Sequence, residues 1–217
     1  MMAEPLVSIV MGSDSDLEVM REAGNALEGF GIAYEMDVTS AHRSPDRTAD
    51  YARNAAGRGI RVIIAGAGGA AHLAGVIAAH TTLPVIGVPI SATSLNGMDS
   101  LLATVQMPAG IPVATVAIGK PGASNAGILA AQILGLSDAG IAQKLAAHKQ
   151  KLARGVEEKS KKLKSSLGGV TKLRPAATAG ADSSHRTGLR QPQAPASSLS
   201  GTGQSRWPET GSHRKQK

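Results

Sequence analysis

The stretch I-A-Y-E-M-D-V-T-S-A-H-R-S-P-D-R-T-A-D-Y-A-R-N-A-A-G, residues 32–57, contains one strand, one loop and one helix in succession. Its apolar first part, Ile32 to Val38, indicates a β-strand, and a helix-like segment starts with a proline, which is favoured at the first helical position. His42 and Arg43 stand side by side in the loop between them. In a parallel sheet this loop lies at the carboxyl edge, where open α/β sheets bind ligands. The stretch therefore predicts a βα unit that carries polar chemistry in its loop.

The same alternation recurs along the chain. Four more short apolar runs lie at Leu6–Met11, Arg61–Ala65, Pro84–Val88 and Val113–Ile118. Most are continuous, as in strands that are buried on both faces of a parallel sheet. Four more helix-like segments lie at Asp16–Gly29, His72–His80, Ser94–Val105 and Ser124–Leu134. This alternation, together with the unit at 32–57, predicts a doubly wound α/β domain.

The C-terminal third differs in composition. A sixth helix is expected to begin with Asp138 as its cap, and its narrow apolar stripe among lysines consists of Ile141, Leu145, Leu152, Val156 and Leu163. We expect this stripe to pack on the domain or on a neighbouring subunit, with a nucleic-acid or membrane contact as the alternative. From Ser165 on, small and polar residues with almost no apolar periodicity cannot bury enough area to offset the entropy of ordering. We therefore predict a folded domain over 1–164 and a disordered basic Gly/Pro/Ser-rich tail over 165–217.

The charge is divided unevenly. Residues 1–142 carry a net charge of −5 and residues 143–217 carry +12, which together give the +7 of the chain. The basic balance thus belongs to the C-terminal third, where any affinity for RNA or DNA would be salt-sensitive and unspecific. The chain has no cysteine, which excludes disulfides and cysteine-ligated metals and fits a cytoplasmic location. No apolar run reaches the roughly 18 residues of a membrane span, so we predict no span. As partners we expect no membrane and no specific nucleic acid.

The loop after the first strand, G-S-D-S-D at residues 12–16, opens the first helix. Unpaired backbone N–H groups at a helix start attract anions. Ser13 is able to donate to a phosphate, and Asp16 is able to accept from ribose hydroxyls. The alternative is that these serine and aspartate side chains only cap the helix.

The S-A-H-R loop at residues 40–43 offers a proton carrier and an anion holder. The His42 imidazole exchanges a proton near neutral pH, and the Arg43 guanidinium holds a phosphate or carboxylate by two hydrogen bonds. In a sheet ordered 2-1-3, this loop and the loop after the first strand open at the same edge, which would bring Ser13, Asp16, His42 and Arg43 together. The alternative is a surface loop whose polar residues cap the following helix.

The loop after the third strand, G-A-G-G-A-A-H-L at residues 66–73, matches the letters of the dinucleotide pattern G-x-G-x-x-A. The pattern also requires an acidic residue about 20 positions on, and the chain has none there. We therefore expect a backbone that approaches a ligand or a neighbouring chain closely. His72 either faces that ligand or serves in capping or packing. The chain also contains no P-loop, no nucleophile elbow and no histidine spacing typical of zinc sites, so no metal is expected.

Four segments together resemble the 5-(carboxyamino)imidazole ribonucleotide mutase family of purine biosynthesis. They are M-G-S-D-S-D (11–16), S-A-H-R-S-P (40–45), A-G-A-G-G-A-A-H-L (65–73) and the run from Leu95 through Gly119, within a resemblance over residues 5–150. The resemblance implies a three-layer α/β/α sandwich like flavodoxin, assembled as a homo-octamer with sites between subunits. The chain has Ala74 and Ser44 where similar enzymes usually have proline and threonine.

The resemblance also implies roles for individual residues. His42 would be the acid and base. The residues that would bind the substrate are Ser13 and Asp16 at the ribose phosphate part, Arg43 at the phosphate, Ser40 in the pocket lining, and Gly68, Gly69, Ala70 and His72 in the wall that handles the carboxylate and carbon dioxide.

The activity that the resemblance implies is an isomerisation that needs no metal, ATP, biotin or other cofactor. The carbamate loses carbon dioxide, which stays enclosed, and the ring carbon next to the amine recaptures it. His72 favours this mutase over a carboxylase that uses aminoimidazole ribonucleotide and free carbon dioxide. A nucleotide-binding or nucleic-acid-binding module that acts through the tail is the alternative from a different class.

Overall fold

Five parallel strands form one sheet in the order β2-β1-β3-β4-β5 in this computed structural model, which describes residues 4–167. The strands are β1 (Val7–Met11), β2 (Tyr34–Val38), β3 (Val62–Gly68), β4 (Val85–Ile90) and β5 (Ala114–Thr115). This order is the flavodoxin-like one. It confirms the predicted α/β fold class and places the loops after β2, β1, β3 and β4 side by side.

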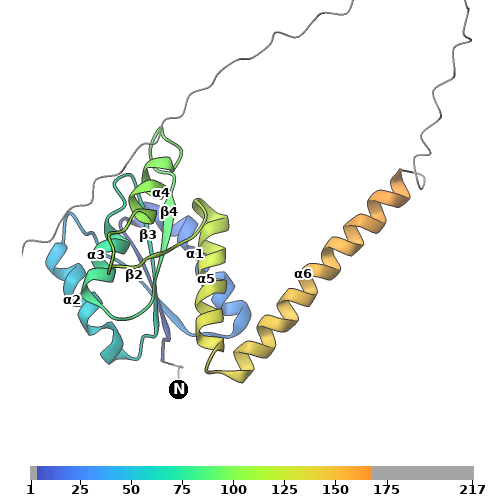
Figure 1. Cartoon of the computed structure of the whole chain (residues 1–217), viewed down its shortest axis with the longest axis horizontal. Helices are drawn as coiled ribbons and strands as arrows, with labels where there is room; N and C mark the ends of the chain where they lie inside the picture. The colour runs from blue at the N-terminus through green and yellow to red at the C-terminus, as the bar shows by residue number, and fades with distance from the viewer. Residues whose placement is uncertain (1–3, 168–217) are drawn as a thin grey trace, which may run out of the picture. The chain divides into compact units, whose positions relative to one another are not determined.

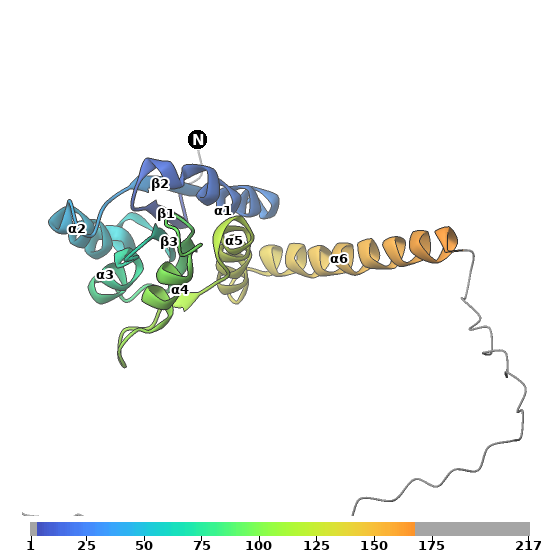
Figure 2. The same ribbon diagram turned by 90° about the horizontal axis from the view of Figure 1, so that it is seen from above.

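Helices cover both faces of the sheet (Figure 1). Seen from above, α1 and α5 lie on one side of the strands, and α2 and α3 lie on the other (Figure 2). The helices are α1 (Leu17–Phe30), α2 (Pro45–Ala55), α3 (Leu73–His80), α4 (Met98–Val105), α5 (Gly119–Gly135) and α6 (Ala139–Ser166), with short 3-10 turns at Asp14–Asp16 and Ala56–Arg58. The domain therefore has three layers.

The strand period of two divides the core into two halves. In β1, Val7, Ile9 and Met11 point to the α1 and α5 side, whereas Val10 points to the α2 and α3 side. Every residue of β1 is buried. Because the strand is apolar on both faces, the sheet is fixed between two helix layers, and polar function is left to the loops at its ends.

Several boundaries differ from those expected, among them those of α4, β5 and α5. α4 begins four residues later than Ser94 because Asn96 and Gly97 adopt left-handed backbone, with φ of 53° and 85°. β5 keeps only two of its expected residues, which pair with Ile86 and Gly87 of β4. α5 begins at Gly119, five residues before Ser124, and a Cβ on its Gly122 would lie 1.6 Å from the carbonyl oxygen of Ala117. The glycine permits a backbone contact that gives no apolar signal in the sequence.

The first turns of α6 pack on the domain. Asp138 caps the helix as predicted and accepts a hydrogen bond of 3.0 Å from the backbone N–H of Ile141, which is buried. The Lys144 ammonium donates to the carbonyl oxygen of Phe30 at the end of α1. Further along, Leu152 and Val156 are exposed. The first part of the apolar stripe therefore packs on the domain, which is one of the two packing arrangements expected for it.

Within residues 4–167, none of the helices combines the length and apolar character that crossing a bilayer demands. The tail predicted for 165–217 lies outside the described residues from position 168 on.

Candidate active site

A pocket of about 420 Å³ opens at the carboxyl edge of the sheet. Four loops line it, those that follow β1, β2, β3 and β4, together with the end of β3 and the first residue of α3. The lining residues are Gly12, Ser13, Ser15, Asp16, Ser40, Ala41, His42, Arg43, Ala67, Gly68, Ala71, His72, Leu73 and Ala92. The structure thus brings together seven of the nine predicted site residues, from segments up to 59 positions apart between Ser13 and His72.

The loop after β1 is both a cap and a pocket wall. The Ser13 hydroxyl oxygen accepts from the backbone N–H of Ser15 at 3.3 Å and from the Ser15 hydroxyl at 2.9 Å. Asp16 is only 6% exposed. Burial raises the pKa of the Asp16 carboxyl, although hydrogen bonds from the Ser13 backbone and the Ser15 side chain act in the opposite direction. The two interpretations of this motif, capping and ligand binding, are therefore compatible.

The loop after β2 is closed by hydrogen bonds between its two ends. The backbone N–H of Ser40 donates to the Ser44 hydroxyl at 3.1 Å, and the backbone N–H of Ser44 donates to the Ser40 carbonyl at 2.9 Å. Arg43 adds a tie to the neighbouring loop, because its Nη2 donates to the Gly12 carbonyl at 2.9 Å. His42 therefore sits in a loop that has little freedom.

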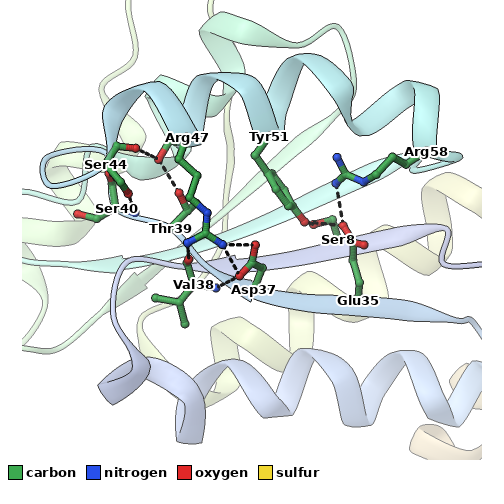
Figure 3. A network of polar contacts seen from close by, with 11 residues as sticks. Ser8, Glu35, Asp37, Val38, Thr39, Ser40, Ser44, Arg47, Tyr51 and Arg58 are labelled. Carbon is green, nitrogen blue, oxygen red and sulfur yellow. Dashed lines mark hydrogen bonds and ion pairs between the residues drawn. The ribbon is translucent and has the colours of Figure 1, made fainter.

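Polar contacts attach the start of α2 to the end of β2 (Figure 3). The Thr39 and Thr48 hydroxyls are 2.7 Å apart and buried, and Thr48 also donates to the Ser44 carbonyl. Arg47 binds both carboxylate oxygens of Asp37, at 3.0 and 2.9 Å, and donates to the Val38 carbonyl. These contacts join residues that precede the His42 loop in the sequence to residues that follow it. They therefore hold the two ends of the loop in place.

A second set of contacts fixes the middle of α2 against the sheet (Figure 3). The Tyr51 hydroxyl donates to Glu35 of β2 at 2.5 Å, so Ser8 of β1, which is fully buried, must be the donor in its hydrogen bond to Tyr51. Arg58 donates to the same Glu35 oxygen and lies over the Tyr51 ring. Burial, followed by the hydrogen bond to Glu35, raises the pKa of Tyr51 well above its ordinary value. Helix and sheet are therefore joined by a partly buried polar chain.

The two pocket histidines contact each other directly. His42 Nε2 and His72 Nδ1 are 2.7 Å apart, and the rings meet edge to face at 76° with centroids 4.9 Å apart. His42 comes from the loop after β2 and His72 from the loop after β3, so the contact spans the end of β1. Both residues are exposed to the pocket side. The His72 side chain makes no capping hydrogen bond to α3, which leaves its ligand-facing interpretation as the one the geometry favours.

The turn between β3 and α3 holds unusual backbone. Gly69 has φ of 60°, and Ala71, buried at 3% exposure, has φ of 41°. A non-glycine residue in this region costs roughly 1–3 kcal/mol and is kept only where its surroundings impose it. Gly68, Ala71 and His72 line the pocket, whereas Gly69 and Ala70 are not among its lining residues. The last two predicted site residues thus shape the turn without facing the cavity.

Sequence reasoning gave no role to several lining residues. Ala41, Ala67 and Ala92 form part of the wall, and they come from the loop after β2, the end of β3 and the loop after β4. Ala92 follows β4, which neighbours β3 in the sheet. Small apolar side chains carry no chemical signal, so only the strand order points to them.

The arrangement suits proton transfer on an anionic small molecule. A guanidinium and a buried carboxylate lie on the same rim as two imidazoles. The guanidinium is able to bind an anion, and the carboxylate is able to accept hydrogen bonds from hydroxyls. The imidazoles are able to exchange a proton near neutral pH.

Comparisons with known proteins agree with this description. The family model described as AIR carboxylase matches residues 6–155. An N5-carboxyaminoimidazole ribonucleotide mutase of Thermotoga maritima is 59% identical over 159 residues, which cover 73% of this chain and 92% of that protein. A protein of the same name from Bacillus subtilis is 57% identical over 160 residues, covering 74% of this chain and 99% of the relative. The crystal structure of Treponema denticola PurE superposes with a TM-score of 0.67 at 30% identity, covering 74% of this chain and 99% of that one.

Proposed function

Because this chain belongs to the AIR carboxylase family, we propose that it is an N5-carboxyaminoimidazole ribonucleotide mutase. It is an isomerase that converts 5-(carboxyamino)imidazole ribonucleotide to 5-amino-4-imidazolecarboxylate ribonucleotide in purine biosynthesis. The observation that carries this proposal is the identity of 57–59% to mutases over nearly their whole length, together with one pocket that holds an imidazole, a guanidinium and a buried carboxylate.

The substrate is bound by the residues that the motifs single out. Arg43 lies against the loop after β1 and binds the phosphate, for which a guanidinium offers paired donors. Ser13 and Asp16 bind the ribose phosphate part, and Ser40 lines the pocket beside them. Gly68 and His72, on a turn that Gly69 and Ala70 shape, form the wall at the reacting carboxylate.

The reaction moves one carboxyl group within the substrate. Protonation of the exocyclic nitrogen breaks its bond to the carboxyl carbon, and carbon dioxide is released into the pocket. The electron-rich ring carbon next to the amine attacks it, and His42 takes the proton from that carbon, which restores the aromatic ring. The same imidazole returns a proton in the next turnover. Because free carbon dioxide must not diffuse away, enclosure and orientation contribute as much as the base.

The direct test is to supply purified protein with each of two substrates. We expect turnover of the carbamate ribonucleotide without added bicarbonate. Turnover of aminoimidazole ribonucleotide with bicarbonate, and none of the carbamate, would instead assign the free carbon dioxide carboxylase. Activity with neither substrate would contradict both enzyme assignments.

A homo-octamer with sites between subunits is part of the proposal. Exposed apolar side chains gather on α4 and the loop before it, where Leu95, Met98, Leu102 and Val105 are 61%, 52%, 47% and 51% exposed. This surface supports burial against another copy of the chain. Mass measurement in solution tests the number of copies. A cytoplasmic location stays a prediction.

The active domain is proposed to be residues 1–164, because every motif lies within it. Deleting residues 165–217 is expected to leave kcat and KM for the carbamate unchanged within about two-fold, since the pocket lies far earlier in the sequence. If the full chain shows no turnover, and RNA binding is lost with the deletion, the nucleic-acid module is the better assignment.

A further inference from the structure

The pairing of His42 with His72 gives His72 a function that the proposed chemistry does not require. Among the side-chain hydrogen bonds of residues 4–167, His42 has a single partner, which is His72 Nδ1 at 2.7 Å. Within that range Asp16 and Arg43, the ionisable residues that share the pocket lining, make no hydrogen bond to either ring. The orientation of the His42 ring therefore depends on one neighbour.

The contact also constrains where hydrogens are placed. An imidazole nitrogen is either a donor or an acceptor, so a short N···N contact contains one hydrogen, and one ring must donate while the other accepts. Fixing the role of His42 Nε2 also determines whether its Nδ1 carries a hydrogen in the neutral ring. Without a partner, the ring of a histidine turns freely between two broad orientations, because its terminal torsion is weakly restricted.

His72 follows a turn of unusual backbone. Its turn includes Gly69 and Ala71 with φ of 60° and 41°, and the N–H of Ala71 donates to the Gly68 carbonyl at 3.2 Å. The His72 side chain is exposed and does not cap α3. Neither packing nor helix capping therefore accounts for the position of this ring.

We propose that His72 is a positioning residue, which sets the orientation and the tautomer of the His42 imidazole. The inference rests on the proposed function, since it assigns His42 as the acid and base. A positioning role of His72 differs from a role in binding the carboxylate because positioning predicts an effect on kcat rather than on KM. A misplaced catalytic group lowers the rate even when the substrate still binds.

Two substitutions at this site separate positioning from the alternatives. His72→Leu removes the nitrogen but keeps a branch at the γ carbon. His72→Asn places an amide atom where Nδ1 lies, the same number of bonds from the backbone, and so retains a hydrogen-bond partner for His42. His80→Leu, at the other end of α3 and outside the pocket lining, is the matched control.

We expect His72→Leu to lower kcat on the order of 10- to 100-fold with KM changed less than about three-fold, and His72→Asn to recover at least about half of that loss on a logarithmic scale. His80→Leu should match the wild type. A kcat of His72→Leu equal to the wild type, an equal loss in both His72 variants, or a rise in KM alone would each overturn the proposal.

A measurement that needs no turnover distinguishes failure of the positioning role from failure of the proposed reaction. In the full-length wild-type protein with ¹⁵N-labelled histidine, NMR should show a coupling between His42 Nε2 and His72 Nδ1 across their shared hydrogen. The His42 nitrogen shifts should change in His72→Leu but not in His80→Leu. Absence of the coupling overturns the positioning role, whereas absence of turnover with the coupling present overturns only the proposed reaction.

Discussion

Gly68 lies so close to Ala92 that a Cβ on the glycine would be 2.5 Å from the Cβ of the alanine. The same Cβ would lie 3.1 Å from the carbonyl oxygen of Ile90. The end of β3 and the loop after β4 therefore meet at the pocket wall with no space for a side chain between them.

Gly68→Ala is expected to displace this wall. The added methyl group must push these two segments apart, which costs about 1–3 kcal/mol of unfolding free energy and reduces kcat for the carbamate ribonucleotide. Thermal unfolding and steady-state kinetics measure the two effects. Gly57→Ala is the control, because a Cβ there meets nothing within 4 Å. Equal stability and activity in the two variants would contradict the close contact.

His42→Asn should abolish turnover and leave binding largely intact. The amide cannot exchange a proton as the imidazole does, and loss of a general acid and base typically costs about 10²- to 10⁴-fold in rate. Because His42 is exposed, the fold should tolerate the change. Rapid-quench kinetics gives the rate, and calorimetry gives the affinity. Near-normal turnover would remove His42 from the mechanism.

Arg43→Ala is expected to raise KM by about 10- to 100-fold, since a charge-assisted hydrogen bond contributes roughly 1.5–3 kcal/mol. Arg43→Lys keeps the charge but loses the paired donors and should show an intermediate KM. Substrate titration of the three proteins measures the series. An unchanged affinity in the alanine variant would exclude the phosphate contact. The hydrogen bond to the Gly12 carbonyl would then be the remaining role of Arg43.

Asp16→Asn should raise the melting temperature at neutral pH and weaken substrate binding. Burial raises the pKa of Asp16 above its ordinary value of 3.8, so the folded state holds the proton more tightly than the unfolded state. The stability from this group is present below about pH 3.8 and is lost as pH rises through the folded pKa. At neutral pH the asparagine variant should therefore melt at a higher temperature than the wild type, with a gap that narrows toward acid. Its KM should rise. Melting curves across the acid range test the sign.

Tyr51→Phe should destabilise the contact between α2 and the sheet. The buried Ser8 hydroxyl loses its partner, which costs about 1–3 kcal/mol. Because burial raises the pKa of Tyr51, the wild type should also lose stability as pH rises above about 10, the unfolded value. Urea unfolding at neutral and alkaline pH measures both effects. In the phenylalanine variant this alkaline loss should be smaller.

The fold was predictable because its signals are local. The strands β1 and β3 are continuous apolar runs, so their position and parallel pairing follow from pattern. The start of α5 was missed since Pro121 and Gly122 lack apolar periodicity, although the glycine permits close backbone contact with Ala117. Glycine contacts and left-handed turns such as Asn96 depend on tertiary structure, which a sequence pattern does not contain.

The site was predictable as a set of loops but not as a geometry. The motifs placed Ser13 and His42 at one edge, and the structure has them in one pocket. The hydrogen bond between His42 and His72 depends on β1 lying between β2 and β3 and on the positive φ of Ala71. Neither can be obtained from the motif letters, because both result from how the sheet and the turn pack.

The wall alanines have a practical consequence for protein engineering. Ala41 and Ala92 line the cavity from the loops after β2 and β4, and Ala67 lines it from the end of β3, while the strands beneath are packed on both faces. Ala41 and Ala67 also pack against the core on the α2 and α3 side, and Ala92 abuts Gly68, so a library that randomises these three positions would change the volume of the chamber and the packing beneath it together. Redesign of ligand preference in this architecture therefore calls for stabilisation of the core beforehand.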